Sequence, residues 1–143
     1  MPGPNPMRSL VAVLGGLLFL FMIGQILELV IVRSAAAAPL ENIEQYMAVR
    51  SRTGVLIALL VSQAVAALLA GYMTAKLASV TEMTHAAMAA AMQTALLVWG
   101  FTVGENAGLT PVWMRIATVL VTAPAMLAGA SVRAKARVLQ EQS

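Results

Sequence analysis

Hydrophobic residues gather into four long runs along the chain, separated by short and more polar stretches. The runs cover residues 10–32, 53–75, 85–103 and 109–131. A helix needs about 20 predominantly apolar residues to cross the hydrocarbon core of a bilayer, and each run is close to that length. The pattern therefore predicts an all-α protein, a four-helix transmembrane bundle that forms a single integral membrane domain.

The stretch SAAAAPLENIEQYMAVRSR between the first two spans has helical character. Pro39 suits the first position of a helix, and Glu41 and Glu44 suit the positive end of its dipole. These features predict a short interfacial helix over residues 39–49.

The other connections are short. The opening MPGPNP predicts an irregular tail because proline is frequent in it. Thr81 suits the cap of the third span, and the glycines and asparagine of GENAG suit a tight reversal before the fourth. Pro124 predicts a kink in the fourth span, which continues as a helix into VRAKARVLQEQS.

Composition supports a membrane protein, because 60% of the residues are hydrophobic and only 10% are charged, against about 25% charged in soluble domains. The chain has no cysteine, which excludes disulfides, thiolate metal sites and thiol nucleophiles. Arg8, the first run and SAAAA also fit a signal peptide, but this run is longer than a typical apolar segment of about 7–15 residues.

Basic residues give a prediction of topology. With four spans, one side of the membrane carries Arg8, Lys76, Arg133, Lys135 and Arg137, and the other side carries Arg33, Arg50 and Arg52. Because lysine and arginine favour the cytoplasmic side, we expect both termini in the cytoplasm, with the protein in a bacterial inner membrane.

Glu28 interrupts the first span about 6 Å below its outer end. One interpretation is a structural carboxylate that reaches the interface or a basic neighbour, and the other is a proton or cation site. Arg115 lies at a similar depth in the fourth span, so a Glu28–Arg115 pair is the first choice. Arg33, Arg50 and Arg52 are its rivals.

Gln63 and Gln93 lie near the middle of the second and third spans. Adjacent antiparallel helices bring them to one level, so we expect the two amides to face each other across the hairpin. Such a pair stabilises a membrane helix interface by about 1 kcal/mol. The alternative is that they line a pore, and Gln25 can join the polar end of the first span.

His85, the one histidine, begins the third span. We expect it to bond to the hairpin, although the alanine-rich sequence around it also makes it a weak candidate ligand of a chlorin. A metal site needs more ligands than this. Without a cysteine, the neighbouring methionines are expected to be packing residues, and no metal or cofactor is predicted: Met73, Met83, Met88 and Met92.

Small residues recur every four positions in two of the spans. The second span has Ala67, Gly71 and Ala75, and the third has Ala87, Ala91 and Ala95. Gly16, Gly24, Ala125 and Gly129 are comparable positions in the first and fourth spans. Such stripes let membrane helices approach closely, and here they are numerous enough to cover outer faces as well as inner ones.

Several short motifs are spread along the whole chain. They are MRSLVAVLGGLL at the start, ELV with Glu28, GYMTAKLA followed by THAAMAAA with His85, and TPVWM followed by APAMLAGA. In these motifs the chain resembles a widespread group of small bacterial four-span membrane proteins with no assigned activity. That group tends to have glycine after the histidine, where this chain has Ala86. The resemblance implies a fold and no reaction.

The sequence favours a non-enzymatic membrane protein, because no nucleophile with a base and no ligand cluster is visible. We expect an accessory or scaffolding subunit that packs against other subunits of a larger complex, of the respiratory or photosynthetic class, or against a copy of itself. The alternative is a small oligomeric transporter or channel with a polar path that includes Glu28. Neither function involves nucleic acid.

Overall fold

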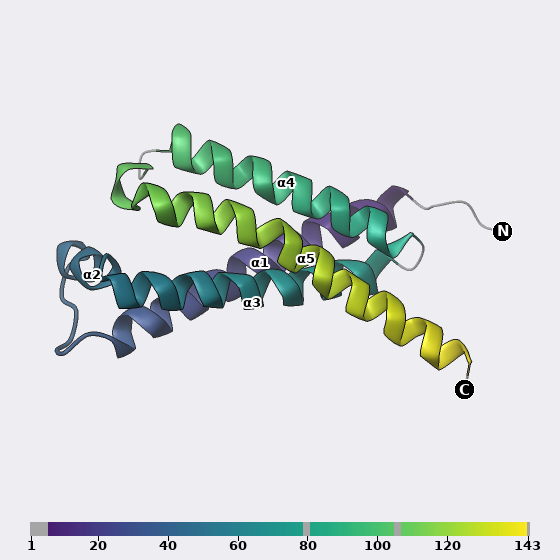
Figure 1. Cartoon of the computed structure of the whole chain (residues 1–143), viewed down its shortest axis with the longest axis horizontal. Coiled ribbons are helices and arrows are strands. Elements are labelled where there is room, and N and C mark those ends of the chain that lie inside the picture. Colours follow the sequence, from purple (N-terminus) through teal and green to yellow (C-terminus); the bar gives the residue numbers. More distant parts are fainter. Residues whose placement is uncertain (1–5, 79–80, 105–106, 143) are drawn as a thin grey trace.

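The computed structural model describes residues 6–78, 81–104 and 107–142, and this part of the chain is helical without strands. Its elements are α1 (Pro6–Ser34), α2 (Ile43–Arg50), α3 (Thr53–Ala78), α4 (Glu82–Thr102), the 3-10 helix η1 (Ala107–Leu109) and α5 (Val112–Glu141). The predicted all-α fold is confirmed (Figure 1).

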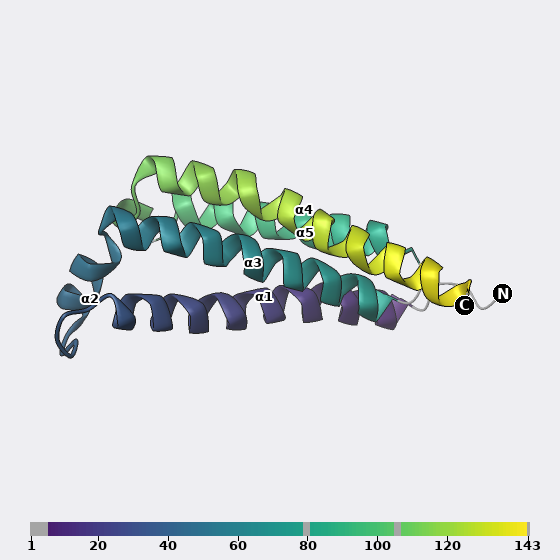
Figure 2. The same ribbon diagram turned by 60° about the horizontal axis from the view of Figure 1, so that its bottom comes forward.

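The four long helices lie side by side in an elongated molecule. Helix α3 is central, because it contacts α1, α4 and α5. Helix α2 lies at one end, beside the last turn of α1 (Figure 2). The first turn of α1 and the last turn of α5 lie at the opposite end, so the bundle has an α2 end and a terminal end.

Three of these helices are long and apolar enough to cross a membrane, namely Ser9–Ser34, Thr53–Ala78 and Val112–Gln140. Helix α4 is not among them by composition. It contains the polar residues Glu82, His85 and Gln93, which lower its mean hydropathy. The structure therefore supports a membrane protein with at least three candidate spans in its described part.

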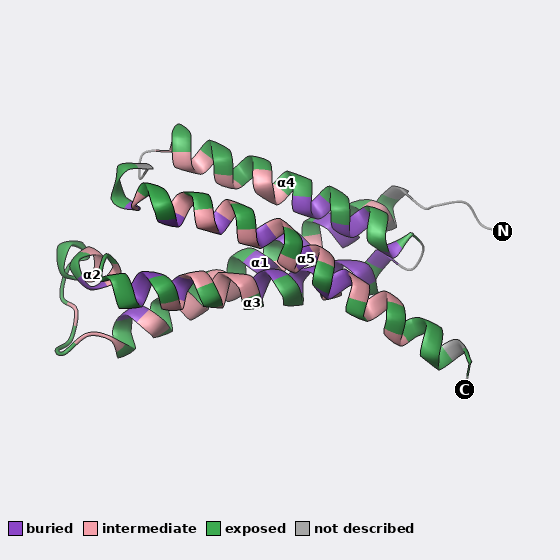
Figure 3. Ribbon diagram, in the orientation of Figure 1, coloured by how far each residue is buried: buried purple, intermediate pink, exposed green. Residues whose placement is uncertain are grey.

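The distribution of side chains is the reverse of that in a soluble bundle. Buried positions are rich in alanine, including Ala66, Ala67, Ala70, Ala89 and Ala130. Many large apolar residues are instead exposed, and Figure 3 shows exposed positions along each of the long helices. Leu18 is 63% exposed and Leu120 is 67% exposed. An apolar surface of this extent is suited to contact with lipid.

Helices α3 and α5 approach each other closely at two glycines. A Cβ added to Gly71 would overlap the carbonyl oxygen of Met126, and one added to Gly129 would overlap that of Leu68. Both obstacles are backbone atoms, which cannot move aside as a flexible side chain can. Helix α3 also approaches α1 closely, where Thr74 packs against Gly16.

Helices α2 and α5 begin later than the sequence predicts, whereas α1 already begins at Pro6, within the predicted tail. Helix α2 begins at Ile43 rather than Pro39. The Asn42 side chain accepts a hydrogen bond from the backbone N–H of Gln45 at 2.9 Å and caps the helix there. Helix α5 begins at Val112 rather than residue 109, after η1 and Pro111.

The start of α4 and the proline of α5 were also predicted from the sequence. Thr81 does occupy the cap position of α4, but its side chain makes no capping bond, and its φ of 53° is in the left-handed region. Helix α5 continues through Pro124 as one element to Glu141. The opening tail to residue 5 and the centre of each short hairpin, residues 79–80 and 105–106, are outside the described residues.

The glycine contacts predict that Gly71→Ala lowers the free energy of unfolding by about 1–3 kcal/mol, because the new methyl group has to push two backbones apart. Unfolding in mixed micelles with increasing SDS measures this change. Gly54→Ala is the control, since a Cβ at Gly54 meets nothing within 4 Å. Equal stability of the two variants would contradict the close approach.

Candidate functional site

A half-buried ion pair joins α1 and α2. Arg50 Nε donates to Glu28 Oε1 at 2.7 Å, and the Tyr46 hydroxyl donates to the same oxygen at 3.3 Å. Arg50 Nη1 also donates to Thr110 Oγ1 at 3.3 Å. Because Thr110 lies two residues before the start of α5, Arg50 connects three parts of the bundle at its α2 end.

The local sequence explains how these groups meet. The Asn42 cap fixes the start of α2, and Tyr46 and Arg50 are four residues apart on one face of that helix. Burial raises the pKa of the Tyr46 phenol, and the negative charge and hydrogen bond of Glu28 raise it further. The phenol therefore stays protonated and remains a donor to the carboxylate.

The expected Glu28–Arg115 pair is not formed. Arg115 Nε donates to the Thr110 carbonyl at 2.6 Å, and Nη1 donates to the Phe101 carbonyl at 3.2 Å. Phe101 is in the last turn of α4, where carbonyls have no partner within the helix and a cation is favoured. Arg115 therefore caps α4. Arg52, another candidate partner of Glu28, donates instead to the Ala35 carbonyl at 3.3 Å.

The ion pair borders a cavity between α1 and α4. Two adjoining hollows of about 670 and 240 Å³ share Gly24, Gln25, Glu28, Gln63 and Leu97, and together they form what we call the α1–α4 cavity. Its smaller part also reaches Arg50, Ser62, Thr110 and Thr118. Its larger part extends along leucines of α1 toward the terminal end of the molecule.

Gln63 and Gln93 both line this cavity, from α3 and α4. No hydrogen bond between their side chains occurs in the structure. Gln63 Oε1 instead lies 3.6 Å from the position of a Cβ on Gly24 of α1. The two amides therefore line one cavity, and the expected amide pair across the hairpin is not formed.

His85 lies at the other end of the bundle and is 7% exposed. Its Nδ1 is 3.0 Å from the Thr81 carbonyl, which is the expected bond to the hairpin. Beside it, the buried Glu82 accepts from Arg137 Nη1 at 3.3 Å, which ties α4 to α5. Over the described ranges, no three histidine, cysteine or acidic side chains come together to hold a metal ion.

A second hollow is an open groove of about 800 Å³ on the outer side of α4 and α5, which we call the α4–α5 groove. Ala87, Ala91 and Ala95 line it and are exposed, unlike the buried Ala67, Gly71 and Ala75 on α3. Thr94 and Trp99 also border it, with Leu127 on α5.

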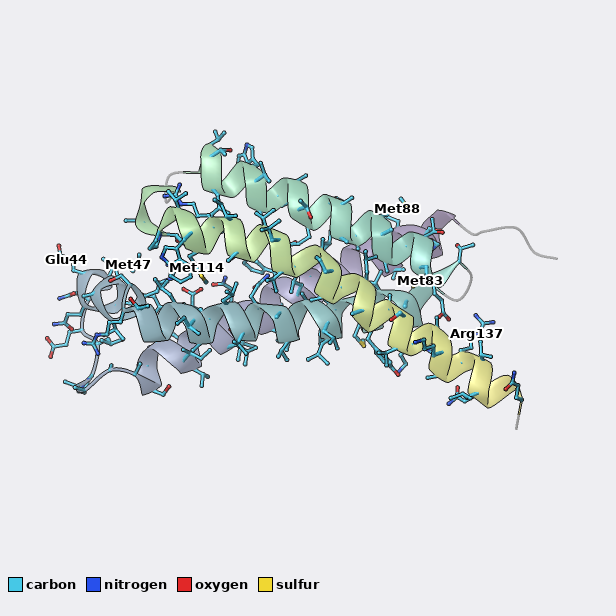
Figure 4. All side chains as sticks on the ribbon, viewed as in Figure 1. Glu44, Met47, Met83, Met88, Met114 and Arg137 are labelled. Atoms are coloured by element: carbon cyan, nitrogen blue, oxygen red, sulfur yellow. The ribbon has the colours of Figure 1, made fainter. Side chains whose placement is uncertain are left out.

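Figure 4 shows the two ends of the bundle with their side chains. Glu44 and Met47 lie on α2 at one end, and Arg137 lies on α5 at the other. Met83 and Met88 project from α4 near the terminal end, and the buried Met114 lies near α2. The methionines are thus spread over the molecule rather than gathered at one point.

Comparison with known proteins identifies no relative. No protein-family model, no curated protein sequence and no solved structure matches the chain. The site must therefore be interpreted from its own geometry.

The ion pair predicts strong coupling between Glu28 and Arg50. Glu28→Gln and Arg50→Gln each strand a half-buried charge, so each lowers the free energy of unfolding, and the double variant loses less than their sum. We expect a coupling energy of about 1–2 kcal/mol, measured by unfolding in micelles.

The matched control for this cycle is Glu28→Gln combined with Arg115→Gln. These two changes should be additive because Arg115 bonds to carbonyls of Thr110 and Phe101 instead. Coupling with Arg115 and none with Arg50 would contradict the arrangement described above.

Proposed function

We propose that the chain is a non-enzymatic integral membrane protein that acts as an accessory or scaffolding subunit of a larger membrane complex. In this proposal, the α4–α5 groove receives a transmembrane helix of another subunit. The single observation that carries it is the exposed stripe of Ala87, Ala91 and Ala95 at the bottom of this groove.

The contrast between the two alanine stripes supports the proposal. On α3 the small residues are buried where α5 packs closely. On α4 a stripe with the same spacing has no helix against it in the described part of the chain. In lipid, small residues let backbones approach and gain packing energy, and they do little at a surface that meets only acyl chains.

We further propose that α4 is the fourth transmembrane span. Its 21 residues extend about 31 Å, which equals the hydrocarbon thickness. Its outward side chains are large and apolar, with Met88 56% and Trp99 62% exposed. Its alanines lie at helix contacts and in the groove.

Four spans place both termini on one side, and the excess of basic residues at the terminal end favours the cytoplasmic side of a bacterial inner membrane. We expect reporter fusions at the two ends to be active in the cytoplasm. Three spans would put the ends on opposite sides, so this measurement also decides whether α4 crosses the membrane.

The alternative is a small oligomeric transporter with a polar path through Glu28. The α1–α4 cavity favours it, because Arg50, Glu28, Gln63 and Gln93 follow one another along its lining. Beyond the glutamines, however, the described lining toward the terminal end is apolar, with Leu14, Leu17 and Leu18. A polar path over half of the bundle is better suited to binding than to conduction.

The groove predicts that Ala91→Phe abolishes association with the partner subunit, because the ring fills the contact surface. The test is purification of the tagged chain in mild detergent with measurement of subunit stoichiometry. Val61→Phe is the control, since Val61 is 59% exposed on α3, away from the groove. A chain that purifies only with copies of itself, or a partner retained equally by both variants, would contradict the proposal.

A further inference from the structure

We infer that the α1–α4 cavity binds a lipid with an uncharged head group that carries hydrogen-bonding oxygens, such as carbonyl or hydroxyl groups. This goes beyond the proposed function and uses a different face of the molecule. The inference combines three features: a polar end with balanced charges, an apolar extension along α1, and a rim open to the bilayer.

The polar end offers hydrogen bonds without net charge. Glu28 and Arg50 neutralise each other at 2.7 Å. Gln25, which is exposed, and the half-buried Gln63 and Gln93 line the larger hollow, and among the described residues no protein group bonds to their amides. An amide at this depth needs a partner that lipid tails cannot supply, and each amide can both donate and accept.

The apolar part continues from these amides along α1. Leu14, Leu17, Leu18 and Phe21 line it, and Leu96 faces them from α4. The lining from Leu14 to Glu28 covers 15 residues of helix, and their Cα atoms span about 21 Å along the axis. This length suits an extended acyl or isoprenoid chain that lies parallel to the helices.

The rim of the cavity is accessible from the bilayer. Leu18, Phe21 and Leu96 are 63%, 62% and 52% exposed. Helix α1 contacts α4 much less than it contacts α3, so these two helices form the open side of the bundle. A molecule dissolved in the membrane can therefore enter from the side without crossing the bulk solvent.

The Glu28–Arg50 pair favours uncharged lipid head groups over charged ones. An anionic head group would meet the Glu28 carboxylate, and a cationic one would meet the Arg50 guanidinium. Either has to break the ion pair in a medium of low dielectric, which leaves one charge uncompensated. An uncharged head group bonds to the amides and leaves the pair intact.

The test is native mass spectrometry of the full chain in detergent, titrated separately with a short-chain ubiquinone analogue, glycerol mono-oleate and phosphatidylglycerol. We expect one of the two uncharged lipids to bind in a one-to-one complex, and which of them binds identifies the source of the head group. Binding of neither, or equal binding of the anionic lipid, overturns the inference.

Variants locate the site. Gln63→Leu and Gln93→Leu should each raise the Kd about fivefold, which corresponds to one hydrogen bond of about 1 kcal/mol. Thr94→Val is the matched control, because Thr94 follows Gln93 but lines the α4–α5 groove. An unchanged Kd in both glutamine variants overturns the assignment.

A third variant tests the site independently in case the two glutamine variants misfold. Gly24 lines both hollows, and an added Cβ there makes only an ordinary contact with Gln63 Oε1 at 3.6 Å. Gly24→Leu should therefore place a side chain where the two hollows meet, keep the unfolding free energy of the native chain and abolish binding. Retained binding in this stable variant overturns the site.

Discussion

The close approach of α3 and α5 at Gly71 and Gly129 is the constraint on which the rest of the bundle depends. Two backbones in contact leave no room for side chains between them, so α3 and α5 form a thin central pair. Helix α1 packs on α3, and α4 packs mainly on α5. Because α1 and α4 rest on different helices of this pair, they diverge, and the α1–α4 cavity is the consequence.

Packing by small residues provides little directional information in lipid, since the hydrophobic effect does not distinguish one apolar face from another. Ion pairs at the two ends of the bundle provide specific, directional contacts between the helices. Glu28 and Arg50 join α1 to α2 at one end, and Glu82 and Arg137 join α4 to α5 at the other. Each pair lies near a helix end, where the desolvation of a charge costs less than at the centre.

The sequence was sufficient for the long helices, because runs of about 20 apolar residues have few alternatives to a helix in lipid. Depth along a helix also indicated that Gln63 and Gln93 lie near each other, and both line the α1–α4 cavity. Depth could not assign the partner of Glu28, since Arg50 and Arg115 both lie near it, and the rotation of each helix about its axis decides between them. The roles of Tyr46 and Thr110 depend on the same rotation, and no spacing rule indicated them.

The α4–α5 groove and the α1–α4 cavity differ in chemistry. The α4–α5 groove is open and lined largely by alanine, so its side chains need apolar atoms to pack against and few hydrogen-bond partners. The α1–α4 cavity has amides without protein partners, so it lacks hydrogen bonds as well as packing. A rigid helix of small and apolar residues satisfies the first, and only a slender molecule with a polar end satisfies the second. Because the two hollows lie on different sides of α4, both can be occupied in one molecule at the same time.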